Sequence, residues 1–410
     1  MQHANGPLSH IRVLDLSRIL AAPWASQTLA DLGADVIKVE RPGAGDDTRS
    51  WGPPFLKDGD GNDTREAGYY LAVNRGKRSI AVSLDQPDGQ AIVRELAKRA
   101  DIVLENYKFG TLQRFGLDYA SLRTLNPGLI YCSVTGFGQT GPRREQPAYD
   151  FLIQAMGGLM SVTGERDDRP GGGPQKVGVP IVDLMTGMYT AVAVLAALAR
   201  RQQTGQGECI DISMFDVQIA TLANQAMNYL ISGRVPQRHG NAHPNIQPQD
   251  VFRCRDGDMI LVVGNDNQFG RLCQALGLTE LAQDPRFVTN AGRVRNLPDL
   301  SEVLRQTFAQ RDRADVIAAL DVAGVPCGAI NTIAEVFDEP QTQARGMLRQ
   351  VPHPQGGTVP QVASPMRFTQ MPLPERAAPP TLGQHSADIL TELGYDPAAI
   401  AALRANGTIG

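Results

Sequence analysis

One acidic residue stands where its carboxylate could do chemistry. Asp183 separates the apolar stretch VGVPIV at 177–182 from a nearly all-apolar run that begins at Met185. Because such a run predicts a long helix over 185–203, Asp183 is expected at a helix N-terminus. It could cap the helix by accepting backbone N–H bonds. Alternatively, those N–H groups could keep the carboxylate ionised in a cleft, where it could attack an activated acyl group. The pattern alone leaves both roles open.

A glycine-rich motif follows a predicted strand at 129–134. Gly136, Gly138 and Gly141 (GFGQTG) have the spacing of a dinucleotide-binding fingerprint. In that fingerprint the pyrophosphate sits at a helix N-terminus directly after the last glycine. Here Pro142 and two arginines follow instead of an apolar helix. The motif therefore favours a plain glycine-rich loop, with a nicotinamide-dependent oxidoreductase as the less favoured alternative.

The histidines and cysteines support neither a hydrolase nor a metal centre. No GxSxG nucleophile motif occurs, and the six histidines lie in the outer segments or in the connector 236–248. His239 and His243, in that connector, lack cysteine or carboxylate partners at zinc-ligand spacing. The five cysteines are scattered singly, which indicates a reduced compartment. We expect no metal site.

Several polar residues follow predicted strands. Arg41 follows DVIKVE at 35–40, and Asn106 and Lys108 follow DIVLE at 101–105. Ligands of parallel α/β sheets bind beyond the carboxyl ends of the strands, so these residues are well placed for phosphate groups. Solvated surface charge is nevertheless the ordinary role for any one of the basic residues near such loops, which are Arg18, Arg41, Arg75, Lys77, Arg78, Lys108 and Arg114.

The elements that must position these residues alternate between strand and helix over the first two hundred residues. Such a rhythm predicts an α/β fold, a Rossmann-like large domain with a mostly parallel sheet. After about residue 205 this regular alternation of strand and helix patterns ends. An Asp256-Gly257 turn signal between apolar runs predicts a hairpin, and helical patterns at 272–276 and 301–320 complete a smaller α+β domain. Further predicted strands are 11–16, 35–40, 79–84, 101–105 and 208–214, and further predicted helices are 24–32, 89–99, 121–125, 217–231 and 387–393.

Charge and hydropathy argue against a nucleic-acid-binding protein and against a membrane protein. The 410 residues carry 39 Lys plus Arg against 43 Asp plus Glu, a net charge of −4, so no basic excess favours nucleic acid or an anionic membrane. The longest apolar stretch, 188–199, is shorter than the ~20 residues of a membrane span. The N-terminus lacks the pattern of a signal or transit peptide. We expect a cytoplasmic protein with no nucleic-acid or membrane partner.

Segments along nearly the whole chain resemble one enzyme family. They are VLDLSRILAAPWASQTLADLGADVIKVERPGAGDDTR, NRGKRSI, ADIVLENYKFGTLQRFGL, LIYCSVTGFGQTGP, VDLMTGMYTAVAVLAAL, TGQGECIDISMFD and LGQHSADIL. In order and spacing they resemble the family III CoA-transferases, the formyl-CoA and carnitine CoA-transferase type. GPPF, YYLAVNR, AYDFLIQAMGGLMSVTG and IQPQDVFRCRDG are most similar to the succinyl-CoA:glutarate, or dicarboxylate, branch.

This resemblance implies that Asp183 is the catalytic nucleophile, forming an aspartyl-CoA thioester. Acyl-CoA and a carboxylic acid would be the substrates, with no tightly bound cofactor. The family forms an interlocked homodimer, whose C-terminal segment returns to the large domain, so we expect domains at 1–205, 206–329 and 330–410. The positions that match the family's CoA contacts are Leu20, Ala21, Arg41, Val82, Ser83, Leu84, Asp85, Asn106, Tyr107, Lys108, Arg114, Thr135, Gly136, Phe137 and Gly138.

Departures from other branches narrow the expected substrate. Formyl-CoA transferases have a glutamine where this chain has Leu20 and a longer glycine run where it has only Gly240-Asn241, which argues against oxalate and formyl-CoA. The racemase branch has a His-Asp pair where this chain has Tyr149-Asp150, and tyrosine, with a pKa of about 10, is a poor acid/base substitute.

The resemblance to the glutarate branch also predicts substrate contacts. Arg75 is expected to bind the distal carboxylate of a dicarboxylate acceptor, and Tyr149 and Asn241 to line the substrate site. A racemase-like enzyme and a CoA-binding protein without catalysis remain alternatives. The sequence does not distinguish glutarate from other small dicarboxylates as the acceptor.

Overall fold

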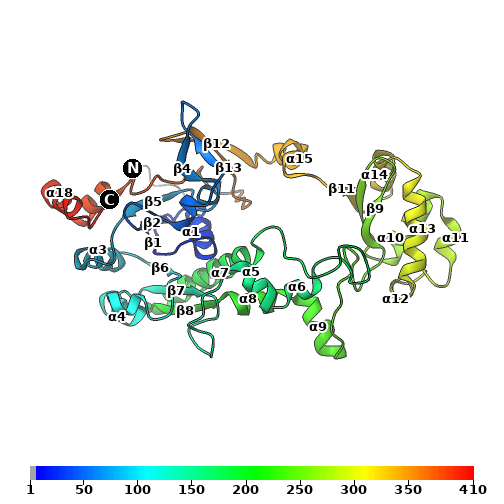
Figure 1. The fold of residues 1–410 in the computed structure, drawn as a ribbon, viewed down its shortest axis with the longest axis horizontal. Coiled ribbons are helices and arrows are strands. Elements are labelled where there is room, and N and C mark those ends of the chain that lie inside the picture. Colours follow the sequence, from blue (N-terminus) through cyan, green and yellow to red (C-terminus); the bar gives the residue numbers. More distant parts are fainter. Residues whose placement is uncertain (1–5) are drawn as a thin grey trace. The chain divides into compact units, whose positions relative to one another are not determined.

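The computed structural model describes residues 6–410 and divides into two compact units (Figure 1). The first contains the N-terminal residues up to 159, with 177–226 and 341–410, and the second contains 160–176 and 227–340. These bounds differ from the expected domains 1–205, 206–329 and 330–410. The first unit extends beyond residue 205 because strand β8 (Glu208–Ser213) still pairs with the large sheet.

A six-stranded parallel sheet forms the centre of the first unit. Its order is β5-β2-β1-β6-β7-β8, which in order of appearance along the chain is the Rossmann arrangement 3-2-1-4-5-6. The expected Rossmann-like α/β fold is therefore confirmed. The order reverses at β1, so the loops after β1 and β6 leave opposite sides of one crevice. The strands are β1 (Arg12–Asp15), β2 (Asp35–Glu40), β5 (Lys77–Ala81), β6 (Ile102–Glu105), β7 (Ile130–Thr135) and β8.

Alternate residues of each strand face two separate apolar layers. Val13 of β1 packs into the layer made by α1 (Ala21–Asp31) and α7 (Ile181–Thr204). Its neighbour Leu14 packs into the opposite layer, made by α3 (Pro87–Lys98), α4 (Tyr119–Leu125), α17 (Ser386–Leu393) and α18 (Pro397–Ala405). The C-terminal helices thus cover the same sheet as the N-terminal ones (Figure 1).

Helix α7 is an interior helix of this unit. By length and composition it could cross a membrane, with a mean hydropathy of 1.8 over its most apolar window. Its Val194 and Leu198 are instead buried with α1 and the sheet strands. It begins at Ile181, four residues before the predicted start, so Asp183 lies inside the first turn and does not precede the helix.

Close contact between α1 and α7 depends on Gly187. A β carbon there would lie 2.5 Å from the Ala21 carbonyl oxygen and 2.9 Å from Trp24 Cβ. We predict that Gly187→Ala lowers the free energy of unfolding by about 1–3 kcal/mol, measured by urea denaturation, because backbone must move. Gly270→Ala on α10 (Asp266–Leu276) is the control, since its β carbon meets nothing within 4 Å. Equal effects of the two changes would contradict this account of the packing.

Two hairpins of the first unit have no counterpart in the predicted elements: β3 (Phe55–Lys57) with β4 (Asp63–Ala67), and β12 (Leu348–His353) with β13 (Gly357–Val362). The single helix predicted over 217–231 is two, α8 (Met214–Thr221) and α9 (Ala223–Ser232), because Ala223 has a φ of 45°. The remaining short helices outside the second unit's core are η1 (Asp47–Ser50), α2 (Gly68–Leu71), η2 (Leu112–Phe115), α5 (Asp150–Met156), α6 (Leu159–Val162) and α16 (Pro340–Ala344).

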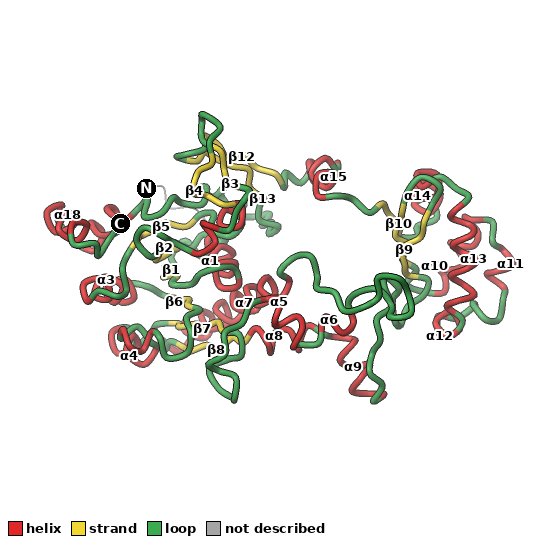
Figure 2. Tube along the Cα trace, in the orientation of Figure 1, coloured by secondary structure: helices red, strands yellow, loops and turns green. Residues whose placement is uncertain are grey.

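The second unit has its own small antiparallel sheet, in the order β11-β10-β9, formed by Cys327–Ala329, Asp258–Val262 and Gln249–Arg253. Figure 2 shows two of these strands, β9 and β10, in yellow beside red helices. The predicted hairpin is confirmed, whereas the predicted 301–320 helix is two, α13 (Leu297–Ala309) and α14 (Arg313–Val322). Its other helices are α10, α11 (Thr279–Gln283), α12 (Asn290–Arg295) and α15 (Ile333–Asp338).

Candidate active site

Two adjoining cavities at the carboxyl ends of the large sheet's strands contain most of the predicted contacts. The Asp183 cavity, of about 160 Å³, includes Leu20, Ala21, Asn106, Tyr107, Lys108, Thr135, Gly136, Tyr149 and Asp183. The Arg41 cavity, of about 290 Å³, includes Arg41, Val82, Ser83, Leu84, Asp85, Tyr107 and Arg114. The cavities adjoin because Arg18 and Tyr107 line both.

The loops after β1 and β6 are bonded together where the cavities meet. Asn106 accepts the Arg18 N–H at 2.9 Å and donates to the Arg18 carbonyl at 2.7 Å. The Glu105 carboxylate accepts the Tyr107 N–H at 2.8 Å. Burial raises the pKa of Glu105 to about 7, although hydrogen bonds from Ser133 and Tyr107 oppose the shift. The sheet therefore fixes the positions of both loops.

Asp183 is the third residue of α7 and is 8% exposed. The cap position is Pro180, and the helix-end N–H groups of Val182 and Asp183 donate to Asp150 Oδ2, at 2.8 and 3.3 Å. The interpretation of Asp183 as a helix cap is therefore wrong. Within residues 6–410 no donor is bonded to the Asp183 carboxylate.

The electrostatic surroundings of Asp183 also differ from the expectation. Burial, and then the negative charge of Asp150, raise the pKa of Asp183 to about 7. The expectation that helix-end N–H groups keep this carboxylate ionised is wrong, because those groups are bonded to Asp150 instead. The consequence is a basic, poorly solvated carboxylate, a better nucleophile than an ordinary aspartate when ionised.

A tyrosine hydroxyl lies within the field of the same two carboxylates. Burial, and then the charges of Asp183 and Asp150, raise the pKa of Tyr69 to about 12. Its ring packs edge-to-face on Trp51, with centroids 5.1 Å apart. Tyr69 therefore stays protonated at neutral pH and keeps a hydroxyl hydrogen for donation. Tyr69 begins the YYLAVNR segment, in which the sequence predicted no role for this residue.

The glycine-rich loop forms a turn without a helix behind it. Gly138, with a φ of 83°, donates its N–H to Thr135 Oγ1 at 2.9 Å. A β carbon on Gly136 would lie 2.3 Å from Ala148 Cβ, so the loop folds back on itself. The next helix, α5, begins only at Asp150. No helix N-terminus follows the last glycine, so the loop lacks the geometry of a nicotinamide site.

Other predicted residues lie near the Asp183 cavity or apart from it. Phe137 packs against Phe215, with ring centroids 5.6 Å apart. Although Thr135 and Gly136 line the Asp183 cavity, Phe137 and Gly138 are not among the lining residues of either cavity. Asn241 is an exposed residue of the second unit. Arg75 donates Nε to Asp31 at 2.9 Å and lines a different, largely apolar cavity of about 980 Å³ that excludes Asp183.

The basic residues near the sheet fall into two groups. Lys77 is buried against Asp15 at 3.1 Å and Arg78 pairs with Asp35 at 2.8 Å, so for Lys77 the expectation of surface charge is wrong. Arg41, Lys108 and Arg114 are exposed at the cavities, and none forms an ion pair within the described part of the chain. Unpaired cations at strand ends are the ones available to an anionic ligand.

Sequence reasoning missed several lining residues. Lys38, Asp46, Phe109, Arg144 and Met214 also line the two cavities. Arg144 follows the glycine-rich motif, and its guanidinium stacks over Phe109 at 4.5 Å. A signal for Phe109 was available, since it continues the loop after β6.

Comparisons with known proteins show the family to which the chain belongs. Residues 8–386 match the profile of CoA-transferase family III. The chain is 50% identical to a succinate–glutarate CoA-transferase of Agrobacterium fabrum, over 96% of this chain and 97% of the relative. It is 42% identical to a succinyl-CoA:glutarate CoA-transferase of Mus musculus, over 98% and 90%.

A solved structure agrees as well. The crystal structure of a CAIB/BAIF family protein from Brucella suis matches with a TM-score of 0.82 and 49% identity, over 95% of this chain and all of that one. Together with the profile match over most of the chain, this means that the protein belongs to CoA-transferase family III.

Proposed function

We propose that this protein transfers CoA from succinyl-CoA to glutarate or a similarly small dicarboxylate, through a CoA thioester on Asp183. The observation that carries the proposal is the Asp183 carboxylate itself, buried, without a bonded donor in the described chain, and on the wall of a cavity at the switch point of the sheet. The identity of 50% with a succinate–glutarate CoA-transferase supports the choice of substrates.

The chemistry needs only the carboxylate and the substrates. Ionised Asp183 attacks the thioester carbonyl of succinyl-CoA and expels CoA thiolate, leaving a succinyl-aspartyl anhydride. The thiolate attacks the aspartyl carbonyl of the anhydride, which releases succinate and forms the aspartyl-CoA thioester. Glutarate then attacks this thioester, giving a glutaryl-aspartyl anhydride and thiolate. Attack of the thiolate on the glutaryl carbonyl yields glutaryl-CoA and regenerates Asp183.

The proposed CoA position follows from the charges. CoA carries phosphate groups, and Arg41, Lys108 and Arg114 are the exposed cations without ion-pair partners in the described chain at the two cavities. With the phosphates in the Arg41 cavity, the pantetheine arm would pass Arg18 and Tyr107, which line both cavities, and bring the thioester to Asp183. Acyl-CoA is a substrate in this scheme, and no further cofactor takes part.

Intact-mass spectrometry after incubation with succinyl-CoA alone tests the proposal. We expect a CoA-sized adduct on the wild type and none on Asp183→Asn, and we expect glutarate to discharge it with formation of glutaryl-CoA. If another dicarboxylate discharged the CoA adduct and glutarate did not, that dicarboxylate would replace glutarate as the proposed acceptor. No adduct, on a protein that still binds CoA, would overturn the thioester mechanism and leave a binding protein.

The pH dependence of transfer should respond to Asp150. Because Asp150 helps to raise the pKa of Asp183 to about 7, Asp150→Asn should lower it, by about 1 unit. The carboxylate must be ionised to attack, so activity is lost as pH falls through this pKa. The acid limb of kcat/KM for succinyl-CoA should therefore move to lower pH. Glu145→Gln, at an exposed residue of the same cavity, is the control. An equal shift in both variants would contradict the assignment.

For the acceptor, the proposal keeps Arg75 as the residue that binds the distal carboxylate. This rests on the resemblance, because Arg75 is already paired with Asp31 and lines a cavity without Asp183. Lysine lacks the bidentate geometry of arginine, so Arg75→Lys should raise KM for glutarate about tenfold and leave KM for succinyl-CoA unchanged. An unchanged KM for glutarate would contradict the assignment of Arg75 to the acceptor-binding site.

We further propose a homodimer in the cytoplasm. Exposed apolar side chains on α7, among them Met188, Tyr189 and Val192, offer a surface for a second copy. Sedimentation at micromolar concentration should give twice the mass of one chain. All five cysteines are free thiols, as a reducing compartment requires.

A further inference from the structure

We infer that the buried ion pair between Lys38 and Asp46 positions acyl-CoA, because it holds Ile19, which lines the Asp183 cavity, in a left-handed backbone conformation. The inference deepens the proposed function and rests on it. Neither residue is argued to react. Each acts through the loop 16–20, which connects β1 to α1 and carries Arg18 and Leu20 to the cavity walls.

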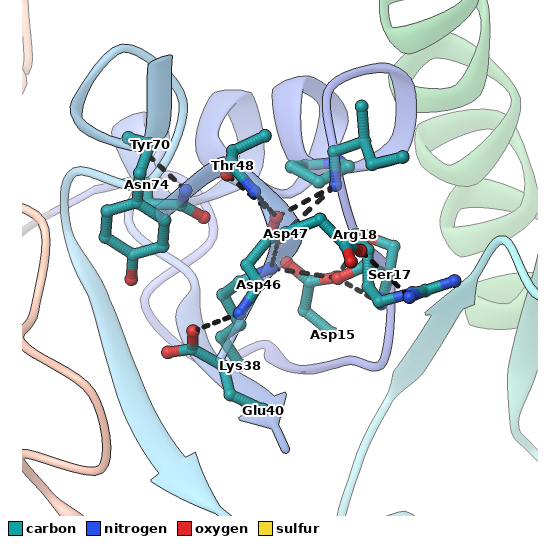
Figure 3. Close-up of polar contacts among 12 residues, drawn as sticks. Asp15, Ser17, Arg18, Lys38, Glu40, Asp46, Asp47, Thr48, Tyr70 and Asn74 are labelled. Atoms are coloured by element: carbon teal, nitrogen blue, oxygen red, sulfur yellow. Dashed lines mark hydrogen bonds and ion pairs between the residues drawn. The ribbon is translucent and has the colours of Figure 1, made fainter. Parts of the chain in front are cut away.

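The pair borders the Arg41 cavity without being exposed to solvent, and both of its members are bonded to the loop (Figure 3). Lys38 Nζ lies 2.9 Å from Asp46 Oδ2, and both side chains are 0% exposed. Lys38 also donates to the Ser17 carbonyl at 2.8 Å. The Ile19 N–H lies 3.3 Å from each carboxylate oxygen of Asp46. Two residues of the loop, Ser17 and Ile19, are therefore bonded to one ion pair.

Asp46 is itself held rigidly. Its Oδ1 accepts the Thr48 N–H at 3.0 Å and the Thr48 hydroxyl at 2.7 Å, capping η1, and its own N–H donates to Glu40 at 3.0 Å. On the other side of the loop, Asp15 accepts the Ser17 N–H at 3.0 Å. The loop is thus clamped between the end of β1 and the segment after β2.

The ion pair between Lys38 and Asp46 is needed to hold the loop, because the backbone of the loop is strained. Ile19 has a φ of 73°, where a β-branched residue is a genuine outlier. Such strain persists only where the surroundings over-determine the conformation, and it concentrates at functional sites. The Asn106 side chain bonds to the backbone of Arg18, and within the described residues it makes no hydrogen bond to Ile19. In the described chain, Asp46 is the side chain that receives the Ile19 N–H.

Relaxation of Ile19 would displace its neighbours on both sides. Arg18 lines both cavities, with its guanidinium 5.5 Å from the Tyr107 ring and Nη1 2.8 Å from Asp47. Its buried Nε has no partner within the described residues. Leu20 caps α1 and lines the Asp183 cavity. The clamp therefore connects the wall of the Arg41 cavity with the neighbourhood of the nucleophile.

A double-mutant cycle separates this role from simple support of the fold. The Kd for CoA is measured by calorimetry for the wild type, Asp46→Asn, Ile19→Gly and the double variant. We expect Asp46→Asn to weaken CoA binding about tenfold when residue 19 is isoleucine. Glycine adopts positive φ without cost, so in the Ile19→Gly background the same change should weaken binding by no more than about twofold.

The control is Asp35→Asn. Asp35 lies on the same strand as Lys38, and the change removes its part-buried ion pairs with Arg12 and Arg78 but no bond to the loop 16–20. For the same loss of melting temperature as Asp46→Asn, Asp35→Asn should leave the Kd for CoA within about twofold of the wild-type value. Equal weakening by Asp46→Asn in both backgrounds, or a Kd that follows melting temperature in every variant, would overturn the inference. Failure of the wild type to bind CoA would instead overturn the proposed function.

Discussion

Asp183→Asn should abolish CoA transfer and at the same time stabilise the protein at neutral pH. The amide cannot attack a thioester carbonyl, so we expect the exchange rate to fall at least about a thousandfold. CoA should still bind, because the unpaired cations around the Arg41 cavity are unchanged. The rate is measured from glutaryl-CoA formed under saturating succinyl-CoA and glutarate.

The gain in stability follows from the pKa of the carboxylate. Burial and Asp150 raise the pKa of Asp183 from its ordinary 3.8 to about 7 in the folded protein. Between these values the unfolded chain is ionised while the folded one holds a proton, so the carboxylate destabilises the fold increasingly as pH rises. Above pH 7 the cost is constant, on the order of 4 kcal/mol. Asparagine, uncharged at every pH, avoids it.

Thermal melts of the two proteins at pH 5 and pH 8 test this argument. The variant should melt at a higher temperature than the wild type at pH 8, and the difference should be smaller at pH 5. The control Glu145→Gln, at an exposed carboxylate, should show no such dependence. A gain in melting temperature that is the same at both pH values would show that the charge of Asp183 is not its cause.

The sequence predicted the sheet better than the surroundings of the nucleophile. Alternating strand and helix patterns predicted each strand of the parallel sheet, because local hydrophobic periodicity is enough for that. The arrangement of Asp150 beneath Asp183 joins α5 to α7 through bonds between residues 32 and 33 positions apart. No local sequence pattern records such a contact, so the sequence left two roles open for Asp183. In the structure it is Asp150, and not Asp183, that accepts the N–H groups at the start of α7.

Buried charge was the other feature beyond the reach of the sequence. In DVIKVE, Lys38 occupies a position that looks like a solvated one, yet β2 is covered on both faces and the side chain is 0% exposed. Lys77 is equally enclosed, and burial lowers its pKa to about 8. Each is tolerated because a carboxylate from another segment meets it. The partner, Asp46 or Asp15, becomes apparent only when the segments are assembled.

The largest loss of stability is expected from a second buried charge cluster beside that clamp. Arg49 donates to Glu40 and to Glu66, each at 2.7 Å, and all three side chains are at most 5% exposed. Its guanidinium also lies 3.7 Å from the centre of the Tyr70 ring. Arg49→Met keeps much of the packing but removes the ion-pair partner of two buried carboxylates. We expect a loss of about 3–5 kcal/mol in the free energy of unfolding.

The pH dependence of that loss identifies its cause. Burial raises the pKa of Glu66, and Arg49 is the main influence that opposes the rise. Without Arg49 the pKa of Glu66 must rise further, so the carboxyl takes up a proton at a higher pH and its charge no longer opposes folding. The loss measured by urea unfolding should therefore be smaller at pH 5 than at pH 8. Arg200→Met, which breaks an exposed pair with Glu208, should cost no more than about 1 kcal/mol at either pH. A loss for Arg49→Met that is equally large at both pH values would assign the effect to lost packing against Tyr70, not to unpaired charge.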